Sequence, residues 1–238
     1  MTEGALVCGF SDPAAEIAGL AWSLDGAEGG LLLAAGEVQA AAARIVPGDG
    51  ATELSLEAPI ATCEAKLEPK AELAPLPAED GPGGVEATQA TVSFELSKGG
   101  ASGSKRADGH VTRFTGNPLD GTSVLRHLAL PARDGSLLLV IALRPVGAEQ
   151  DGELAGAWVL GANGAGSFGE TLLSTEYDGA GRPTRAGLEL WPDDSDAPPS
   201  RGAATRLGGV EEDHIAATLA GSSVDGTHGI GSYLLWRA

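Results

Sequence analysis

The chain has 238 residues, 33 of them acidic and 15 of them lysine or arginine, which gives a formal net charge of −18 at pH 7. This charge would repel a phosphate backbone or an anionic membrane surface, so the sequence predicts no nucleic-acid partner. A hydrophobic content of 42% is ordinary for a globular protein and argues against disorder over the whole chain.

Turn signals and strand patterns alternate along the sequence. The dipeptide Asp-Gly, which favours tight turns, begins at positions 25, 49, 80, 108, 120, 134, 151, 178 and 225. Apolar and polar residues alternate between these turns, most clearly over residues 53–58 and 89–96, as in half-buried strands. Further strands are expected at residues 4–10, 16–24, 30–36, 39–46, 61–67, 109–115, 122–130, 135–144, 155–161, 168–177, 182–191, 202–207, 213–220 and 228–237.

One segment departs from the strand pattern. The alanine-rich stretch VQAAAARIV at 38–46 favours a helix by propensity, although it is short and lies between Gly36 and Pro47. Helical periodicity is nearly absent elsewhere. We therefore predict an all-β fold, an antiparallel, hairpin-rich β-barrel or sandwich, with strand content above about 35% and helix content below about 15%.

Three segments rich in proline, glycine or serine are predicted loops, at 69–84, 99–106 and 191–203. The segments before and after the middle of the chain both consist of expected hairpins separated by Asp-Gly turns. We place an N-terminal β half at residues 1–115 and a C-terminal β half at 116–238, and a single large β domain remains the alternative.

The motif GAGSFG at 164–169 matches the dinucleotide fingerprint G-x-G-x-x-G. That mechanism needs a helix directly after the glycines, whereas ETLLSTEYDGAG is typical of a hairpin. We predict that residues 170–190 form a hairpin turning at Asp178-Gly179. Its inward-facing residues are expected to be Leu172, Ala186, Leu188 and Leu190.

The four histidines, His110, His127, His214 and His228, show no local metal-ligand spacing, so no metal or cofactor is predicted from them. A metal site built from distant strands stays open. His228 follows the Asp225-Gly226 turn and is expected at the mouth of a strand. No catalytic residue can be assigned from the sequence.

The strongest site candidates are Arg126 and His127, in the stretch TSVLRHLAL. Period-two alternation places the two side chains on opposite faces of a strand whose faces are both largely apolar. A buried ionisable group must find a partner or change its protonation, and a polar group inside a β cavity is a candidate ligand contact. We expect one of the two to line a pocket and the other to be a structurally paired group.

The four tryptophans each lie in or at the end of an expected strand. Such side chains fill a core or form the broad apolar walls of a cavity. If there is a cavity, Trp158 and Trp191 are the predicted ligand contacts beside Arg126 and His127.

The longest apolar run, residues 137–143, is far shorter than the ~18 residues of a membrane-spanning helix. The N-terminal MTEGALVCGFSD has an acidic residue where a secretory signal needs basic ones. We expect no membrane span and a cytoplasmic location. Cys8 and Cys63 are then expected to be free buried thiols, with a single bridge between them left open.

The closing strand, with its G-x-G-x-Y-x-x-x-R pattern over residues 229–237, and the stretch LLSTEYDGAGRPTRAGLELW are similar to segments of the tandem lipocalin-like proteins of the carotenoid 1,2-hydratase type. The resemblance covers about the C-terminal two-thirds of the chain and concerns architecture, so no catalytic residue is carried over. It implies two abutting barrels or half-barrels around an apolar cavity suited to a lipid-like or isoprenoid ligand.

Three classes of function remain open. The first is a β-barrel protein that binds a small apolar molecule without catalysis. The second is a hydratase-like or isomerase-like enzyme that uses acid/base chemistry on an apolar ligand. The third is a structural or interaction β domain with no cavity. The sequence leaves the ligand and the oligomeric state unassigned.

Overall fold

The computed structural model describes residues 5–24, 26–72, 74–76, 84–98, 101–149, 152–193 and 198–238. Strands account for 74% of this part of the chain, and it has two short 3-10 turns, η1 (Pro13–Ala15) and η2 (Arg133–Gly135), with one further 3-10 residue at Gly152. The all-β prediction is therefore confirmed. The turns predicted at Asp25, Asp80 and Asp151 begin outside the described residues.

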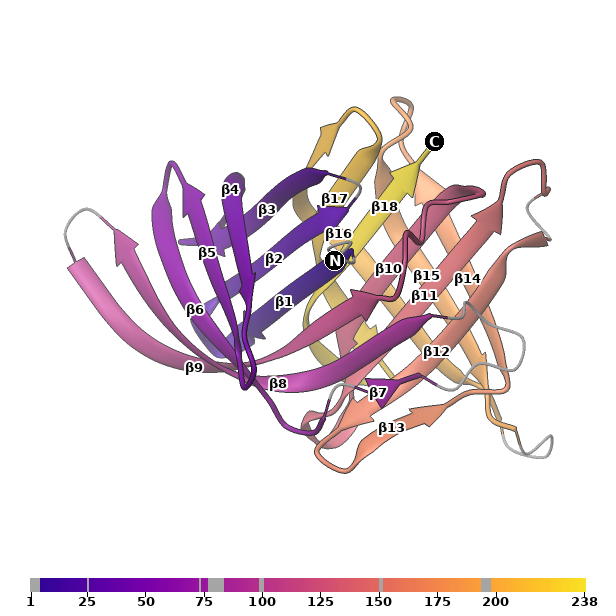
Figure 1. Cartoon of the computed structure of the whole chain (residues 1–238), viewed down its shortest axis with the longest axis horizontal. Coiled ribbons are helices and arrows are strands. Elements are labelled where there is room, and N and C mark those ends of the chain that lie inside the picture. The colour runs from indigo at the N-terminus through magenta and orange to yellow at the C-terminus, as the bar shows by residue number, and fades with distance from the viewer. Residues whose placement is uncertain are drawn as a thin grey trace.

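The first nine strands form one antiparallel sheet, coloured indigo to pink in Figure 1. They are β1 (Leu6–Asp12), β2 (Ile17–Leu24), β3 (Ala27–Ala34), β4 (Glu37–Pro47), β5 (Thr52–Ala58), β6 (Ala61–Pro69), β7 (Ala74–Pro75), β8 (Val85–Lys98) and β9 (Ala101–Phe114). The sheet order is β6-β5-β4-β3-β2-β1-β9-β8-β7, and β6 also pairs with β8. This additional pairing closes eight of the strands into a barrel.

The second nine strands form a separate sheet. They are β10 (Thr122–Pro131), β11 (Leu137–Pro145), β12 (Leu154–Gly161), β13 (Gly164–Ser167), β14 (Glu170–Tyr177), β15 (Pro183–Trp191), β16 (Ser200–Glu212), β17 (Ile215–Val224) and β18 (Thr227–Arg237). The order is β13-β12-β11-β10-β18-β17-β16-β15-β14. In the described pairings β13 and β14 do not join, so this sheet curves into a half-barrel.

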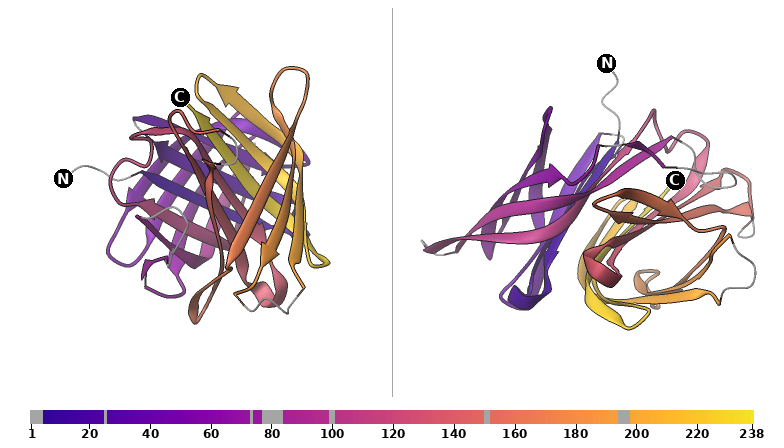
Figure 2. Two further views of the ribbon diagram at one scale, coloured as in Figure 1. Left: turned by 90° about the vertical axis from the view of Figure 1, so that its right-hand side faces the viewer. Right: turned by 90° about the horizontal axis from the view of Figure 1, so that it is seen from below.

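The two sheets repeat one topology. In each, neighbouring strands follow one another in sequence, and the last strand pairs with the first, β9 with β1 and β18 with β10. The chain passes from one sheet to the other between Phe114 and Thr122. The barrel and the half-barrel lie against each other in the views of Figure 2. Their treatment as two domains divided at residue 115 remains a prediction.

Three apolar clusters hold this arrangement together. One fills the barrel and includes Cys8, Phe10 and Phe94. Another lies inside the half-barrel, and the third lies between the two sheets, with Val7 from the barrel and Leu139 from the half-barrel among its members. Strands such as β1 and β11 are therefore buried on both faces, which explains why they read as almost continuous apolar runs.

Several predicted turns are confirmed, and one is wrong. Asp225 and Gly226, with φ of 44° and 81°, form the two-residue turn between β17 and β18. Asp108-Gly109 instead lies inside β9. A Cβ atom at Gly109 would lie 2.5 Å from the carbonyl oxygen of Gly9, so this glycine permits close strand packing rather than a turn.

The strand expected at residues 39–46 is confirmed as part of β4, because pairing with β3 and β5 outweighs the helix propensity of the alanine-rich stretch. One other local prediction is wrong. In the predicted loop at 99–106, residues 101–106 are strand, since β9 pairs with β8 as far as Ala101; Gly99 and Gly100 lie outside the described residues.

The hairpin predicted at 170–190 is present as β14 and β15, which excludes the helix that a nucleotide site after GAGSFG would need. Ala186, Leu188 and Leu190 are buried as predicted. Leu172 is 51% exposed, so its predicted inward orientation is wrong. It pairs with Glu189 on the outer face, and Thr171 is the buried residue beside it.

Both cysteines are free and buried, and burial raises the pKa of each thiol to about 12. They are therefore poor nucleophiles and metal ligands at neutral pH. Among the described residues, no helix has the length and hydrophobicity needed to cross a lipid bilayer.

Candidate functional site

Arg126 and His127 lie side by side on β10 and point to opposite faces of the half-barrel sheet. Their exposed fractions are 3% and 0%, as expected for a strand covered on both sides. His127 shares its face with Leu125 and Ala129 and points toward the barrel, whereas Arg126 lies within the half-barrel. Alternation along β10 therefore puts the two side chains in different environments, His127 between the sheets and Arg126 inside the half-barrel.

His127 joins a second buried histidine at the interface between the sheets. The His127 ring lies 5.4 Å from the ring of His110 on β9, centroid to centroid, and the two rings are stacked. The Nε2 atom of His127 lies 3.0 Å from the hydroxyl of Thr112, also on β9. This contact is a polar link between barrel and half-barrel within an otherwise apolar interface.

Space for the second histidine comes from β1. Gly9 is paired with His110, and a Cβ atom at Gly9 would lie 2.6 Å from the Cε1 atom of His110. Any larger residue there would collide with the imidazole. Gly9 therefore provides the close approach that the stacked pair requires.

Burial keeps both imidazoles neutral. It lowers the pKa of His110 to about 4, and it lowers the pKa of His127 well below 6.5, with the neighbouring His110 acting in the same direction. The Nε2 atom of His110 and the Nδ1 atom of His127 have no hydrogen-bond partner among the described residues. Since an unpaired buried polar group costs about 1–3 kcal/mol, these ring nitrogens are suited to bind a water or a ligand group.

A small cavity touches His110. It measures about 20 Å³ and is also lined by Ser232, whose hydroxyl is likewise buried without a partner in the described chain. A volume of this size holds one water molecule. A water there can hydrogen-bond to groups on both sheets.

A larger cavity of about 190 Å³, which we call the inter-sheet cavity, lies between β8 and the β12–β13 hairpin. Most of its wall is apolar, and Gln89, which pairs directly with His110 across β8 and β9, lies on it. Its lining residues are Ala71, Glu72, Pro75, Leu76, Ala87, Thr88, Gln89, Leu160, Gly161, Gly164 and Ala165. The histidine pair therefore lies beside one polar wall of an apolar cavity.

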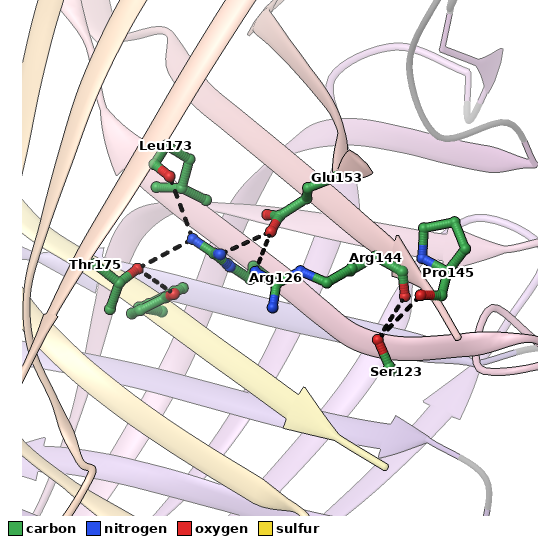
Figure 3. A network of polar contacts seen from close by, with 8 residues as sticks. Ser123, Arg126, Arg144, Pro145, Glu153, Leu173 and Thr175 are labelled. Atoms are coloured by element: carbon green, nitrogen blue, oxygen red, sulfur yellow. Dashed lines mark hydrogen bonds and ion pairs between the residues drawn. The ribbon is translucent and has the colours of Figure 1, made fainter. Parts of the chain in front are cut away.

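Arg126 occupies a different environment, shown in Figure 3. Its guanidinium donates to Glu153 at 2.7 Å, and Arg144 donates to the same carboxylate oxygen at 2.9 Å. Arg126 also donates to the carbonyl oxygen of Leu173 at 3.2 Å, on edge strand β14. Thr175 links this cluster to the hydroxyl of Tyr233 at 2.9 Å. Arg126 thus has the carboxylate partner expected of a paired structural group.

The two tryptophans of the predicted site are far apart in the fold. Trp158 is buried between the sheets, on the face that also carries His127. Trp191 lies half-buried at the end of β15, beside Glu170 at the opposite edge region of the half-barrel sheet. The structure therefore places Trp158 in the same interface as His127, and it places Arg126 and Trp191 elsewhere.

Sequence reasoning missed His110, Gln89 and Glu153. A signal existed for the first, because alternation in GHVTRF puts His110 and Thr112 on one face of a strand, opposite Val111. Gln89 belongs to a predicted strand but carries no mark of burial. Glu153 lies in the connection before β12, and only the fold brings it to Arg126.

A closed barrel joined to a half-barrel of the same topology is consistent with a tandem lipocalin-like architecture. No protein-family model and no curated protein matches the chain. Solved structures do match. An AttH candidate from Nitrosomonas europaea superimposes with a TM-score of 0.66 at 14% identity, over 98% of this chain and 92% of that chain.

Two further structures match over nearly the whole chain. Kievitone hydratase from Nectria haematococca has a TM-score of 0.62 at 10% identity, over 99% of this chain and 89% of that one. CghA with Sch210972 has a TM-score of 0.60 at 10% identity, with the same shares of the two chains. At these identities the likeness shows a shared fold.

Proposed function

We propose that the protein binds a small, largely apolar molecule in the inter-sheet cavity. The observation that carries this proposal is the cavity volume of about 190 Å³ together with walls formed by Leu76, Ala87 and Leu160. An apolar protein cavity of about 150 Å³ is large enough to bind benzene. The resemblance to lipocalin-like proteins of the carotenoid 1,2-hydratase type supports an apolar ligand.

Filling the cavity tests this proposal. Ala165 lines the cavity and pairs with Leu160, whose side chain lies on the inter-sheet face, so Ala165→Leu adds a side chain on the cavity side of β13. We expect the wild type to bind toluene and Ala165→Leu to bind it at least tenfold more weakly, because displaced volume removes the apolar contacts. Isothermal titration calorimetry measures both affinities.

Gly166 provides the matched control, since it follows Ala165 on β13, is exposed, does not line the cavity, and has open space at its Cβ position. Gly166→Leu is expected to bind toluene like the wild type. Equal toluene affinity in Ala165→Leu and the wild type, or no binding by the wild type, would contradict the proposal.

A second candidate function is hydration or isomerisation of a bound alkene. Adding water to a double bond requires a proton donor at one carbon, a water oxygen at the other, and a base that accepts the proton of that water. A neutral imidazole is a base, so the pair His110 and His127, with unpartnered ring nitrogens and a water-sized cavity at His110, offers the group that accepts the proton of that water. The name of kievitone hydratase among the structural neighbours favours the same candidate.

Hydration can be followed with 4-vinylphenol in oxygen-18 water, with mass spectrometry detecting labelled alcohol. If the enzyme candidate is right, the wild type forms labelled alcohol and His127→Gln forms it at least tenfold more slowly, a loss within the range of one general acid or base. His228→Gln, a change at an exposed histidine, is the control. No labelled product from the wild type, or equal rates in His127→Gln, would favour binding without hydration.

A further inference from the structure

The inner face of the half-barrel carries more positive than negative charge. Arg126 on β10, Arg144 on β11 and Arg237 on β18 form what we call the arginine cluster, and Glu153 is the one carboxylate that pairs with it among the described residues. We infer that the arginine cluster binds a small dianionic oxyanion, a sulfate or phosphate group. This site is separate from the inter-sheet cavity, because none of the three arginines lines that cavity.

Strand register brings the three side chains to one face. Arg144 and Arg237 are the two cross-strand neighbours of Val124, and Arg126 lies two residues beyond Val124 on the same strand. Directly paired residues share a face of a sheet, and so do residues two apart on one strand. Val124 packs against the apolar cluster inside the half-barrel, so this face is the inner one. Two strand spacings separate Arg144 from Arg237 by about 10 Å between Cα atoms, a distance that two arginine side chains can span.

The ion pairs of the cluster leave positive charge uncompensated. Arg126 and Arg144 share a single oxygen of Glu153, at 2.7 Å and 2.9 Å. Arg237 has no ion pair within the described part of the chain. Its Cζ atom lies 5.0 Å from the centre of the Tyr177 ring, and its guanidinium donates to a backbone carbonyl oxygen. Three guanidinium groups against one carboxylate leave a local excess of two positive charges, in a chain whose net charge is −18.

The cluster also has hydrogen-bond donors to spare. The Nε atoms of Arg126 and Arg144 are buried without a hydrogen-bond partner in the described chain, and a guanidinium nitrogen can only donate. The hydroxyls of Thr175 and Tyr233 lie 2.9 Å apart and share one hydrogen bond, so one of their two protons is left to donate. Spare donors and excess positive charge together favour an anionic acceptor over a neutral one.

An ion from solution can reach the cluster through its more exposed members. The side chain of Arg144 is 22% exposed and Arg237 is half-buried, whereas the side chain of Arg126 is 4% exposed. Guanidinium groups bind oxyanions through paired N–H···O bonds, and a partly buried position reduces the screening of charge by solvent. The two exposed arginines would therefore contact the oxyanion directly, with Arg126 adding attraction from the interior.

Isothermal titration calorimetry with sodium sulfate, at neutral pH and in a constant background of sodium chloride, tests the inference. We expect the wild type to bind sulfate with a Kd of about 1 mM or tighter, and acetate, which carries one charge, at least threefold more weakly. Arg237→Gln leaves both pairs with Glu153 in place and should bind sulfate at least tenfold more weakly. Arg185→Gln, a change at an exposed arginine of the same half-barrel, is the matched control and should bind sulfate like the wild type.

A change of opposite sign sharpens the test. Glu153→Gln removes the negative charge that competes with the ion, so it should bind sulfate at least threefold more tightly than the wild type. Should Glu153→Gln not fold, the comparison of Arg237→Gln with Arg185→Gln decides. No sulfate binding by the wild type up to about 20 mM, or equal sulfate affinity in Arg237→Gln and the wild type, would overturn the inference. Toluene binding in the inter-sheet cavity is measured separately, so either result leaves the proposed function standing.

Discussion

Lowering the pH from 7 to 5 should reduce the free energy of unfolding by about 2 kcal/mol through His110 alone. In the unfolded chain this imidazole has a pKa near 6.5, whereas burial lowers the pKa to about 4 in the folded protein. Between these values the unfolded state binds the proton and the folded state does not. Stability is therefore lost as the pH falls below about 6.5, and the loss ends near pH 4. His127 acts in the same direction.

Urea denaturation followed by tryptophan fluorescence at pH 7 and pH 5 measures this effect. In His110→Gln the loss between the two pH values should shrink by about 2 kcal/mol, because the titrating group is gone. His228→Gln, which changes an exposed histidine, should leave the pH dependence as in the wild type. Equal pH dependence in all three proteins would show that the pair is already charged or solvated in the native state.

Replacement of Glu153 is expected to cause the largest loss of stability, about 3–5 kcal/mol for Glu153→Leu. The carboxylate is 10% exposed and compensates two guanidinium groups, so its removal leaves Arg126 and Arg144 without a counter-charge. Chemical denaturation at neutral pH measures the change. A double variant, Arg126→Leu with Glu153→Leu, should lose less than the sum of the single changes, because it removes both buried charges of one pair.

A second glutamate–arginine pair in the same half-barrel provides the control. Glu176 and Arg185 are 66% and 54% exposed, with 3.3 Å between carboxylate oxygen and guanidinium nitrogen. Solvent screens such a pair, so Glu176→Leu should change stability by less than about 1 kcal/mol. Similar losses in Glu153→Leu and Glu176→Leu would mean that the buried cluster adds nothing beyond a surface contact.

Much of the fold was predictable because strand periodicity and turn chemistry are local. Residues 53–58 and 90–95 alternate in sequence and in burial, and Asp225-Gly226 forms its predicted turn. Where pairing partners decide the outcome, local reasoning was ambiguous or failed. Residues 38–46 have both a strand pattern and a helix propensity, and pairing with β3 and β5 makes them a strand. Leu172 faces outward because the register sets it beside Glu189.

The candidate site was predictable only in part for the same reason. Period-two alternation alone places Arg126 and His127 on opposite faces of the strand, and both side chains are buried, as the sequence indicates. The partners come from distant segments: Glu153 from the connection before β12, and His110 and Thr112 from the barrel. A single sequence carries no information about which strand of the barrel lies opposite β10. The ligand-contact roles of Arg126, His127, Trp158 and Trp191 remain predictions.

The pairing of first and last strands sets the order in which the protein can fold. A hairpin of neighbouring strands can form as soon as both strands have been synthesised. Leu6 can pair only after Arg113 has been synthesised, and Val124 only after Arg237. Pairings this distant in sequence fold slowly, because loop closure comes before any gain from contact. Until then β1 and β10 each have an unpaired edge, which invites aggregation during synthesis. The stacked histidines belong to β9 and β10, so they can meet only when the barrel and the half-barrel pack against each other.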